Sequence, residues 1–212
     1  MAYVLGFFTA DGNMIRNKRG GCYLEFTTTD RDVLEKIKKL LAVNNKISAI
    51  KRTLNSKICH RIQIGSKEMF NDLIRLGMTP AKSNSIQLPN IPDKYFPDFV
   101  RGYFDGDGCV YFKENWAKDR DKPRWVFQVR FTSGSKDFLR SLWQLLKATE
   151  VCKGGYLYNK SRGFELVFSH HDGLDLSKFM YYNISSDLYL ERKYSIFQKV
   201  FKTLHWTGRS IG

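Results

Sequence analysis

Residues 25–41 have the sequence EFTTTDRDVLEKIKKLL, and residues 130–146 have the sequence RFTSGSKDFLRSLWQLL. The two stretches align without a gap and are identical at six of seventeen positions. Apolar residues recur at helical spacing in both. They are Val33, Leu34, Ile37, Leu40 and Leu41 in the first stretch, and Phe138, Leu139, Leu142, Leu145 and Leu146 in the second. The chain therefore contains an internal repeat, and each copy has a helix with one buried face.

A second correspondence precedes the first. Residues 3–13, YVLGFFTADGN, match residues 99–109, FVRGYFDGDGC, with an offset of 96 instead of 105. The second copy therefore holds an insertion of nine residues. Its place is the charged segment KENWAKDRDKPR at 113–124, where we expect a longer hairpin tip. Asp30 and Ser135 stand where the central helices begin, and both side chains can accept hydrogen bonds from free backbone N–H groups.

The order of elements is the same in both copies. Each predicts a helix, a strand pair, a second helix, a second strand pair and further helices. The first strand pairs should end near Thr27 and Thr132, and the second pairs should lie near 47–64 and 155–168. We predict an α+β fold of two pseudo-symmetric αββαββα repeats with antiparallel sheets. The repeats are expected at 1–83 and 98–212, joined by a linker at 84–97 that contains three prolines.

Composition points to a polyanionic partner. The 212 residues include 35 Lys and Arg against 21 Asp and Glu, a net charge of +14 that favours nucleic acid, with an anionic membrane surface second. No apolar run has the length of a membrane span, and the N-terminal MAYVLGFFTADG lacks the basic start and cleavage site of a signal peptide. We expect an intracellular protein without a membrane partner. The spacing of the four cysteines predicts neither zinc nor a disulfide framework.

The predicted strands alternate between an apolar and a polar face. The polar positions are Tyr23, Glu25 and Thr27 in the first copy, Gln128, Arg130 and Thr132 in the second, and Arg61 and Gln63 in the segment CHRIQIG at 59–65. Such side chains on a two-stranded ribbon can hydrogen-bond base edges in the major groove. The alternative is that these side chains lie on a solvated sheet face without a DNA partner, and for any single residue this interpretation is preferred. Two matched basic faces on one chain favour DNA.

The helix that precedes each first strand pair has an unusual end. Each carries a central glycine, Gly6 or Gly102, and ends in Asp-Gly at Asp11 or Asp107. Interior glycines let two helices approach closely, so the two helices can pack as the seam between the repeats. Their acidic ends would then converge and repel unless a cation lies between them, and hard oxygen ligands suit Mg²⁺. The alternative is that Asp-Gly only ends a helix and leads into a hairpin. That explanation would be enough if the motif occurred once.

These motifs also carry a family resemblance. VLGFFTADG at 4–12 and VRGYFDGDG at 100–108 resemble the two signature motifs of the LAGLIDADG homing endonucleases in their single-chain, two-repeat form. The resemblance spans nearly the whole chain. It implies two sheets that form a saddle, a site-specific double-strand DNA endonuclease with a long asymmetric target, and a monomer. The implied cofactor is Mg²⁺ or another divalent cation such as Mn²⁺, and Ca²⁺ could occupy the site without supporting cleavage.

The resemblance assigns roles to residues position by position. It implies that Asp11 and Asp107, with the preceding Ala10 and Gly106, bind the metal. Lys82, in LGMTPAKS, and Lys193, in YLERKYS, resemble the basic residues beside the active site, although a solvated surface lysine is the alternative for both. Thr28 and Ser133 stand where some members carry a polar residue, often Gln, that orients water near the metal, and both are expected to contact the DNA. Thr9 departs from the acidic residue that Asp105 keeps, at a position that belongs to the helix interface.

The proposed chemistry is metal-dependent hydrolysis of both DNA strands, with electrostatic assistance from Lys82 and Lys193. The repeats differ at outward positions, Glu25 against Arg130 and Tyr23 against Gln128, so the target should be asymmetric. The chief alternative is a nucleic-acid-binding protein that does not cut, such as an intron RNA maturase or a DNA-binding regulator. A third possibility is a basic interaction protein that uses the sheet face against protein. The cellular site would be wherever the host DNA lies.

Overall fold

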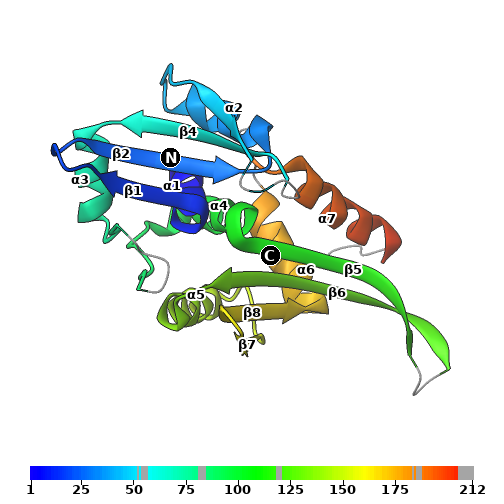
Figure 1. Cartoon of the computed structure of the whole chain (residues 1–212). Helices are drawn as coiled ribbons and strands as arrows, with labels where there is room; N and C mark the ends of the chain where they lie inside the picture. Colours follow the sequence, from blue (N-terminus) through cyan, green and yellow to red (C-terminus); the bar gives the residue numbers. More distant parts are fainter. Residues whose placement is uncertain are drawn as a thin grey trace.

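A computed structural model describes residues 1–51, 53, 57–80, 85–117, 121–182, 184 and 188–204. Two copies of one element order follow each other along the chain (Figure 1). The first copy consists of α1 (Ala2–Asp11), β1 (Gly12–Arg16), β2 (Cys22–Thr28), α2 (Arg31–Leu40), β3 (Ile47–Ile50), β4 (Cys59–Gly65) and α3 (Lys67–Arg75). The second consists of α4 (Phe96–Asp107), β5 (Gly108–Ala117), β6 (Lys122–Ser133), α5 (Lys136–Ala148), β7 (Tyr156–Lys160), β8 (Gly163–Ser169) and α6 (His170–Tyr181). A last helix, α7 (Glu191–Thr203), follows the second copy. The predicted αββαββα repeat is confirmed.

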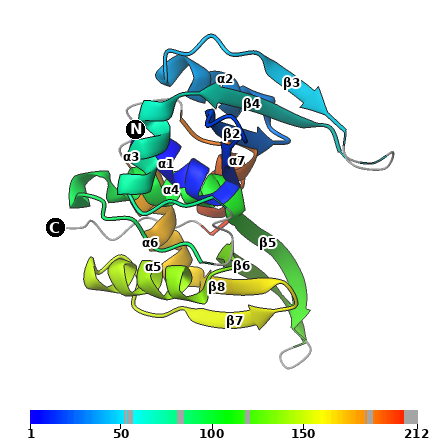
Figure 2. The same cartoon turned by 60° about the vertical axis from the view of Figure 1, so that its left-hand side comes forward.

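Each repeat contributes one four-stranded antiparallel sheet. The strand order is β1-β2-β4-β3 in the first sheet and β5-β6-β8-β7 in the second, so the two sheets have the same topology. Figure 2 shows one sheet on either side of the helix pair α1 and α4. The predicted α+β architecture of two antiparallel sheets is therefore confirmed. No helix within the described residues has the length and apolar character needed to cross a membrane.

The strands alternate as their sequences predict. In β2, residues 22, 24, 26 and 28 are buried and residues 23, 25 and 27 are half-buried. In β6, Phe127, Val129 and Phe131 are fully buried, whereas the residues between them are partly exposed. The apolar faces pack against the helices and leave the polar faces on the other side. A two-residue period thus decides which side chains reach solvent.

The central helices α2 and α5 have the expected single buried face, which includes Leu34 and Ile37 in α2 and Leu139 and Leu142 in α5. Ser135 caps α5 as predicted, because its Oγ accepts a hydrogen bond from the N–H of Phe138 at 3.2 Å. The same prediction for Asp30 is wrong. Its side chain makes no cap bond to α2 and instead binds Arg192 of α7.

The insertion in the second repeat lengthens a hairpin. The β5–β6 ladder runs from the pair Gly108 and Phe131 to the pair Ala117 and Lys122, whereas the β1–β2 ladder ends at Arg16 and Cys22. Part of the segment 113–124 therefore forms paired strand, where a tip alone was expected. Figure 1 shows this hairpin extending past the other strands of its sheet.

The segment between the repeats leads directly into the second seam helix. Within the described part of the linker, residues 85–92 form no helix or strand, and a short 3₁₀ turn, η2 (Asp93–Tyr95), follows. Helix α4 begins at Phe96 with Pro97 in its first turn, where proline's missing N–H costs nothing. The last two residues of the predicted linker thus belong to α4.

Candidate functional site

The seam between the repeats is the contact of α1 with α4. A Cβ atom on Gly6 would lie 2.1 Å from the backbone oxygen of Phe99, and one on Gly102 would lie 2.0 Å from that of Tyr3. Any side chain at either position would therefore collide with the backbone of the other helix. The two glycines allow the close approach that the sequence predicted, and the contact is reciprocal because the repeats are related by a pseudo-twofold axis.

The acidic residues end the two seam helices. Asp11 is the last residue of α1 and Asp107 the last of α4, and in each repeat a glycine then starts the first strand. A Cβ atom on Gly106 would lie 3.5 Å from Oδ2 of Asp11. Burial raises the pKa of the Tyr103 phenol, and the charges of Asp107 and Asp11 raise it further. The acidic ends of the two helices therefore lie beside each other at one end of the seam.

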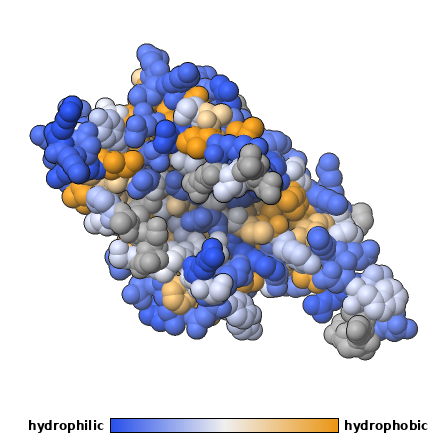
Figure 3. Space-filling model, viewed as in Figure 1, coloured by the Kyte–Doolittle hydropathy of each residue, from blue (hydrophilic) through white to orange (hydrophobic). Residues whose placement is uncertain are grey.

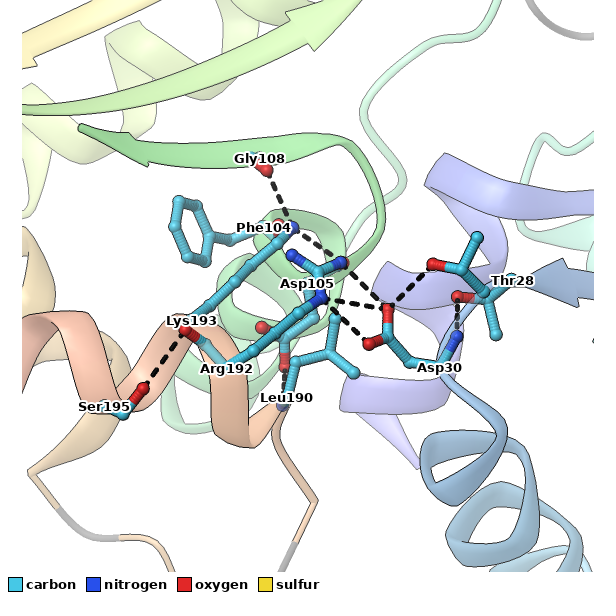
Figure 4. A network of polar contacts seen from close by, with 10 residues as sticks. Thr28, Asp30, Phe104, Asp105, Gly108, Leu190, Arg192, Lys193 and Ser195 are labelled. Atoms are coloured by element: carbon cyan, nitrogen blue, oxygen red, sulfur yellow. Dashed lines mark hydrogen bonds and ion pairs between the residues drawn. The ribbon is translucent and has the colours of Figure 1, made fainter. Parts of the chain in front are cut away.

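Lys193 closes the end of α4. Its Nζ lies 2.7 Å from the backbone oxygen of Phe104, 2.8 Å from that of Asp105 and 2.7 Å from that of Gly108 (Figure 4). A cation at the C-terminal carbonyls compensates the negative end of the helix dipole. The residue is 4% exposed, and this burial lowers the pKa of its ammonium group to about 8. Lys193 is thus an enclosed cap of the helix that carries Asp107, not a solvated lysine.

Asp105 is the buried acid of the second motif. Its Oδ2 accepts hydrogen bonds from the Tyr3 hydroxyl at 2.8 Å and from the N–H of Leu190 at 2.9 Å. Burial raises the pKa of its carboxyl group to about 6, an effect that the nearby charge of Lys193 opposes. Its counterpart Thr9 is also buried, but its hydroxyl donates to the backbone oxygen of Leu5 in the same helix at 2.7 Å. Thr9, which stands where the second motif has an acid, therefore finds its hydrogen-bond partner within α1.

An ion pair joins α7 to the first repeat. The guanidinium of Arg192 donates to both carboxylate oxygens of Asp30, with the shortest distance 2.8 Å from Nε to Oδ1 (Figure 4). This bidentate contact lowers the pKa of the Asp30 carboxyl group. No local pattern in the sequence predicts it, because the partners are 162 residues apart. Adjacent residues of α7 thus reach the end of α4 and the start of α2.

The polar face of the first sheet holds the predicted DNA contacts from two neighbouring strands. Glu25 of β2 lies opposite Gln63 of β4, and Thr27 lies opposite Arg61. Glu25 and Arg61 form a diagonal ion pair, with 3.4 Å between Oε2 and Nη1. Tyr23 lies on the same side of β2 and is half-buried. These side chains therefore form one continuous polar surface.

The polar face of the second sheet is built around Arg130. Its Nε donates to Oε1 of Gln128 at 3.1 Å, its Nη1 lies 4.0 Å from Oε2 of Glu165, and its guanidinium carbon lies 5.3 Å from the centre of the Tyr111 ring. Thr132 donates from its hydroxyl to the backbone oxygen of Asp107 at 2.6 Å, which ties this face to the acidic helix end. Tyr111 and Glu165 of this face were not predicted from the sequence. Their alternation with apolar neighbours along the strand could have indicated that they lie on the polar face.

Two predicted contact residues have their hydroxyl groups engaged elsewhere. Thr28 lies on the buried face of β2, 9% exposed, and its Oγ1 accepts the N–H of Asp30 at 3.2 Å. This burial does not fit the predicted DNA contact of Thr28. Ser133 is half-buried, and its Oγ accepts the N–H of Ser135 at 3.1 Å. Both hydroxyl groups stabilise the turn into the following helix.

A cleft of about 300 Å³ opens beside Asp107. Its lining residues are Asp107, Thr132, Ser133, Gly134, Lys160, Ser161, Arg162, Gly163 and Phe164. The two cations, Lys160 and Arg162, come from the β7–β8 turn and were not predicted from the sequence. Lys82, the other predicted basic residue of the site, lies outside the described residues. The cleft thus brings two cationic side chains to the same opening as Asp107.

The carboxylate and backbone oxygens predicted at the end of the seam suit a divalent cation whose other ligands are water and phosphate. The described residues contain no group of three or more His, Cys, Asp or Glu that could hold a metal by itself. The predicted set has two carboxylates, of Asp11 and Asp107, and the backbone oxygens of Ala10 and Gly106. Lys193 and Thr132 bind the backbone oxygens of residues 104, 105, 107 and 108, and none of these belongs to that set. Mg²⁺ typically takes one or two protein carboxylates together with water and phosphate.

Comparison with known families assigns the chain. Residues 1–75 and 98–152, more than half of its length, match the family described as "LAGLIDADG-like domain". The chain belongs to the LAGLIDADG family. The matched segments of this LAGLIDADG protein contain both acidic helix ends and the strand pair that follows each of them.

Solved structures of meganucleases have a similar fold. Meganuclease I-SmaMI bound to uncleaveable DNA gives a TM-score of 0.64 at 16% identity, covering 94% of this LAGLIDADG chain and 88% of that chain. The LAGLIDADG meganuclease I-AabMI bound to uncleaved DNA gives 0.65 at 17% identity, covering 96% and 90%. At these identities the similarity establishes the fold.

Two curated archaeal proteins match over a small part of their length. A probable translation initiation factor IF-2 of Methanocaldococcus jannaschii is 29% identical over 147 residues, which are 66% of this LAGLIDADG chain and 12% of that protein. A probable IF-2 of Thermococcus kodakarensis is 30% identical over 158 residues, 72% of this chain and 12% of that protein. The chain thus spans about an eighth of either relative.

Proposed function

We propose that this LAGLIDADG protein is a site-specific double-strand DNA endonuclease of the homing type, which hydrolyses one phosphodiester bond in each strand. The observation that carries the proposal is the placement of Asp11 and Asp107 at one end of the seam, between two sheets with polar faces. Two adjacent acidic helix ends suit two cuts in a duplex that lies across both repeats. Because one chain supplies both acids, the active species is a monomer.

The acidic residues would hold Mg²⁺ or Mn²⁺ with the backbone oxygens of Ala10 and Gly106. A divalent cation held there supplies an activated water and stabilises the charge that develops on the phosphate. Ca²⁺ would bind without supporting cleavage, and one of the similar structures is I-SmaMI bound to uncleaved DNA in the presence of calcium ions. Lys193 fixes the end of α4 and so positions Asp107.

The remaining cations would bind and orient the duplex. The net charge of +14 favours a polyanion, and Lys160 and Arg162 place positive charge in the cleft beside Asp107. The surface seen in Figure 3 is mainly hydrophilic, with apolar residues in small separate groups, as expected of a face that meets a charged ligand. The polar sheet faces would select the sequence through Arg, Gln and Tyr side chains.

The test is a library of randomised DNA duplexes incubated with the protein and Mg²⁺, with sequencing of the cut ends. We expect wild type to cut a recurrent long site in both strands, and Asp11→Asn and Asp107→Asn each to abolish cutting of at least one strand. Asp72→Asn, at an exposed acid of α3, is the matched control and should cut normally. Cutting by the two site variants at the wild-type rate would refute the proposal.

A non-cleaving nucleic-acid-binding protein is the second candidate, and two observations favour it. The Lys193 ammonium is enclosed by three backbone oxygens, and the hydroxyls of Thr28 and Ser133 are occupied by backbone N–H groups. Groups predicted to assist a phosphate or orient water are thus used for structure. Such a protein, a DNA-binding regulator or an intron RNA maturase, would bind duplex DNA or intron RNA tightly without cutting in the same assay.

A further inference from the structure

The two polar sheet faces carry the same diagonal ion pair with its charges exchanged. Glu25 and Arg130 occupy equivalent positions, because β2 aligns with β6 in the internal repeat. Arg61 lies opposite Thr27 in the ladder, and Glu165 lies opposite Thr132, so these two positions are also equivalent. In the first repeat the arginine is on β4 and the glutamate on β2. In the second repeat the arginine is on β6 and the glutamate on β8.

In both pairs the arginine is the more accessible partner. The side chain of Arg61 is 42% exposed and that of Glu25 is 16% exposed, with 3.4 Å between their nearest charged atoms. The side chain of Arg130 is 30% exposed and that of Glu165 is 11% exposed, at 4.0 Å. Glu165 also accepts a hydrogen bond from Lys160. The glutamates are thus recessed partners, and the arginine side chains are the more exposed ones. Oε1 of Gln128 also accepts hydrogen bonds from Nε and Nη2 of Arg130, at 3.1 and 2.5 Å.

We propose that Arg61 and Arg130 are the arginines that recognise guanine in the two DNA half-sites, with Arg61 positioned by the recessed Glu25 and Arg130 by Gln128 and the recessed Glu165. A guanidinium fixed in this way can donate two hydrogen bonds to guanine O6 and N7 in the major groove. The inference rests on the proposed DNA-binding function and adds the base that the two arginines read. It assigns Glu25 and Glu165 a positioning role, distinct from contact with a base.

The exchange of strands has a measurable consequence for the target. Adjacent strands are about 4.8 Å apart, and two residues along a strand span about 6.8 Å, so the Cα atoms of the two arginines depart from pseudo-symmetry by about 8 Å. The charged ends of each pair meet, with 3.4 Å between the nearest atoms in the first repeat and 4.0 Å in the second, so the guanidinium groups depart from pseudo-symmetry by only about 4 Å. With about 3.4 Å per base pair, the displacement of the guanidinium groups equals about one base-pair step. The guanine preferred in one half-site should therefore be displaced by about one step from the position that exact symmetry would give.

The experiment compares DNA targets selected by wild type and by the double variant Glu25→Arg/Arg61→Glu. This variant keeps an ion pair and gives the first repeat the arrangement of the second. Duplexes randomised in both half-sites are selected by binding without Mg²⁺ and sequenced. We expect the guanine preference of one half-site to shift by about one base pair, with roughly a tenfold change in preference at each position, and the other half-site to stay unchanged.

The matched control is Arg31→Glu/Glu35→Arg, which exchanges an exposed ion pair on α2 and should leave both half-site profiles unchanged. If the exchanged variant does not fold by circular dichroism, Glu25→Gln/Arg61→Gln replaces it, and the preference should vanish at the affected positions. Specific binding with an unaltered profile in the exchanged variant, or in its replacement, would overturn the inference. If wild type selects no sequence at all, the proposed function fails first.

Discussion

The ends of the two seam helices differ although their sequences and packing match. Helix α4 ends with Asp105 buried beside the enclosed ammonium of Lys193, which binds two backbone oxygens of the last turn and that of Gly108 at the start of β5. Helix α1 has Thr9 at the position of Asp105, and that hydroxyl bonds within its own helix. The backbone contacts of Gly6 and Gly102 are therefore the same in both helices, whereas the buried charges lie at the end of α4. The two repeats stay alike where the helices must approach closely.

The largest expected effect tests the symmetric part. Gly6→Ala and Gly102→Ala each place a Cβ atom at about 2 Å from a backbone oxygen of the other helix. Because backbone atoms cannot rotate away, we expect each variant to lose about 3 kcal/mol or more of unfolding free energy, by similar amounts. Urea denaturation measures this loss.

Gly65→Ala is the control for the glycine variants. Its added methyl group would lie 3.5 Å from the Tyr23 ring, an ordinary contact, so the change in unfolding free energy should be small. A loss at Gly6 much smaller than the loss at Gly102 would show that the seam is not symmetric.

A second, smaller effect tests the asymmetric part. Lys193→Met removes the ammonium group from three backbone oxygens and leaves the Asp105 carboxylate without its nearest cation. We expect a loss of about 3 kcal/mol in unfolding free energy, measured by urea denaturation, from buried acceptors left unsatisfied. Lys199→Met, at an exposed position of the same helix, should have almost no effect. Equal losses in the two variants would contradict the capping role.

The smallest effect concerns the contact between α7 and the first repeat. Asp30→Asn removes one charge of the ion pair with Arg192, and we expect a loss of about 1 kcal/mol at pH 7, because solvent screens the half-exposed guanidinium. Arg192 lowers the pKa of Asp30 in the folded state, so this stabilisation is present above the unfolded pKa. It disappears as the pH falls through the lower, folded value.

The measurement for Asp30 is the difference in unfolding free energy between wild type and Asp30→Asn as a function of pH. The difference should be constant near neutrality and should shrink below about pH 4. Asp32→Asn, at an exposed acid in the first turn of α2, controls for the helix dipole. A difference that grows as the pH falls would contradict the assigned ion pair.

Much of the fold was predictable because its signals are local. The alternation of Leu24 and Phe26 with polar neighbours fixed the faces of β2, and the helical spacing of Leu139 and Leu142 fixed the buried face of α5. The capping prediction for Asp30 failed because a cap competes with any distant cation that packing brings near. Arg192 is such a cation, and its bidentate geometry is the stronger interaction.

By itself, the amino-acid sequence determined the internal repeat, the two sheets, the seam glycines and the acids at the helix ends. These features depend on periodicity and on the bare backbone at two positions, which a linear pattern records. Only the tertiary structure decided that Lys193 caps α4, that Arg162 lines a cleft beside Asp107 and that the diagonal ion pairs are exchanged. Those contacts join segments far apart in the chain, and packing of the whole molecule selects which side chains meet.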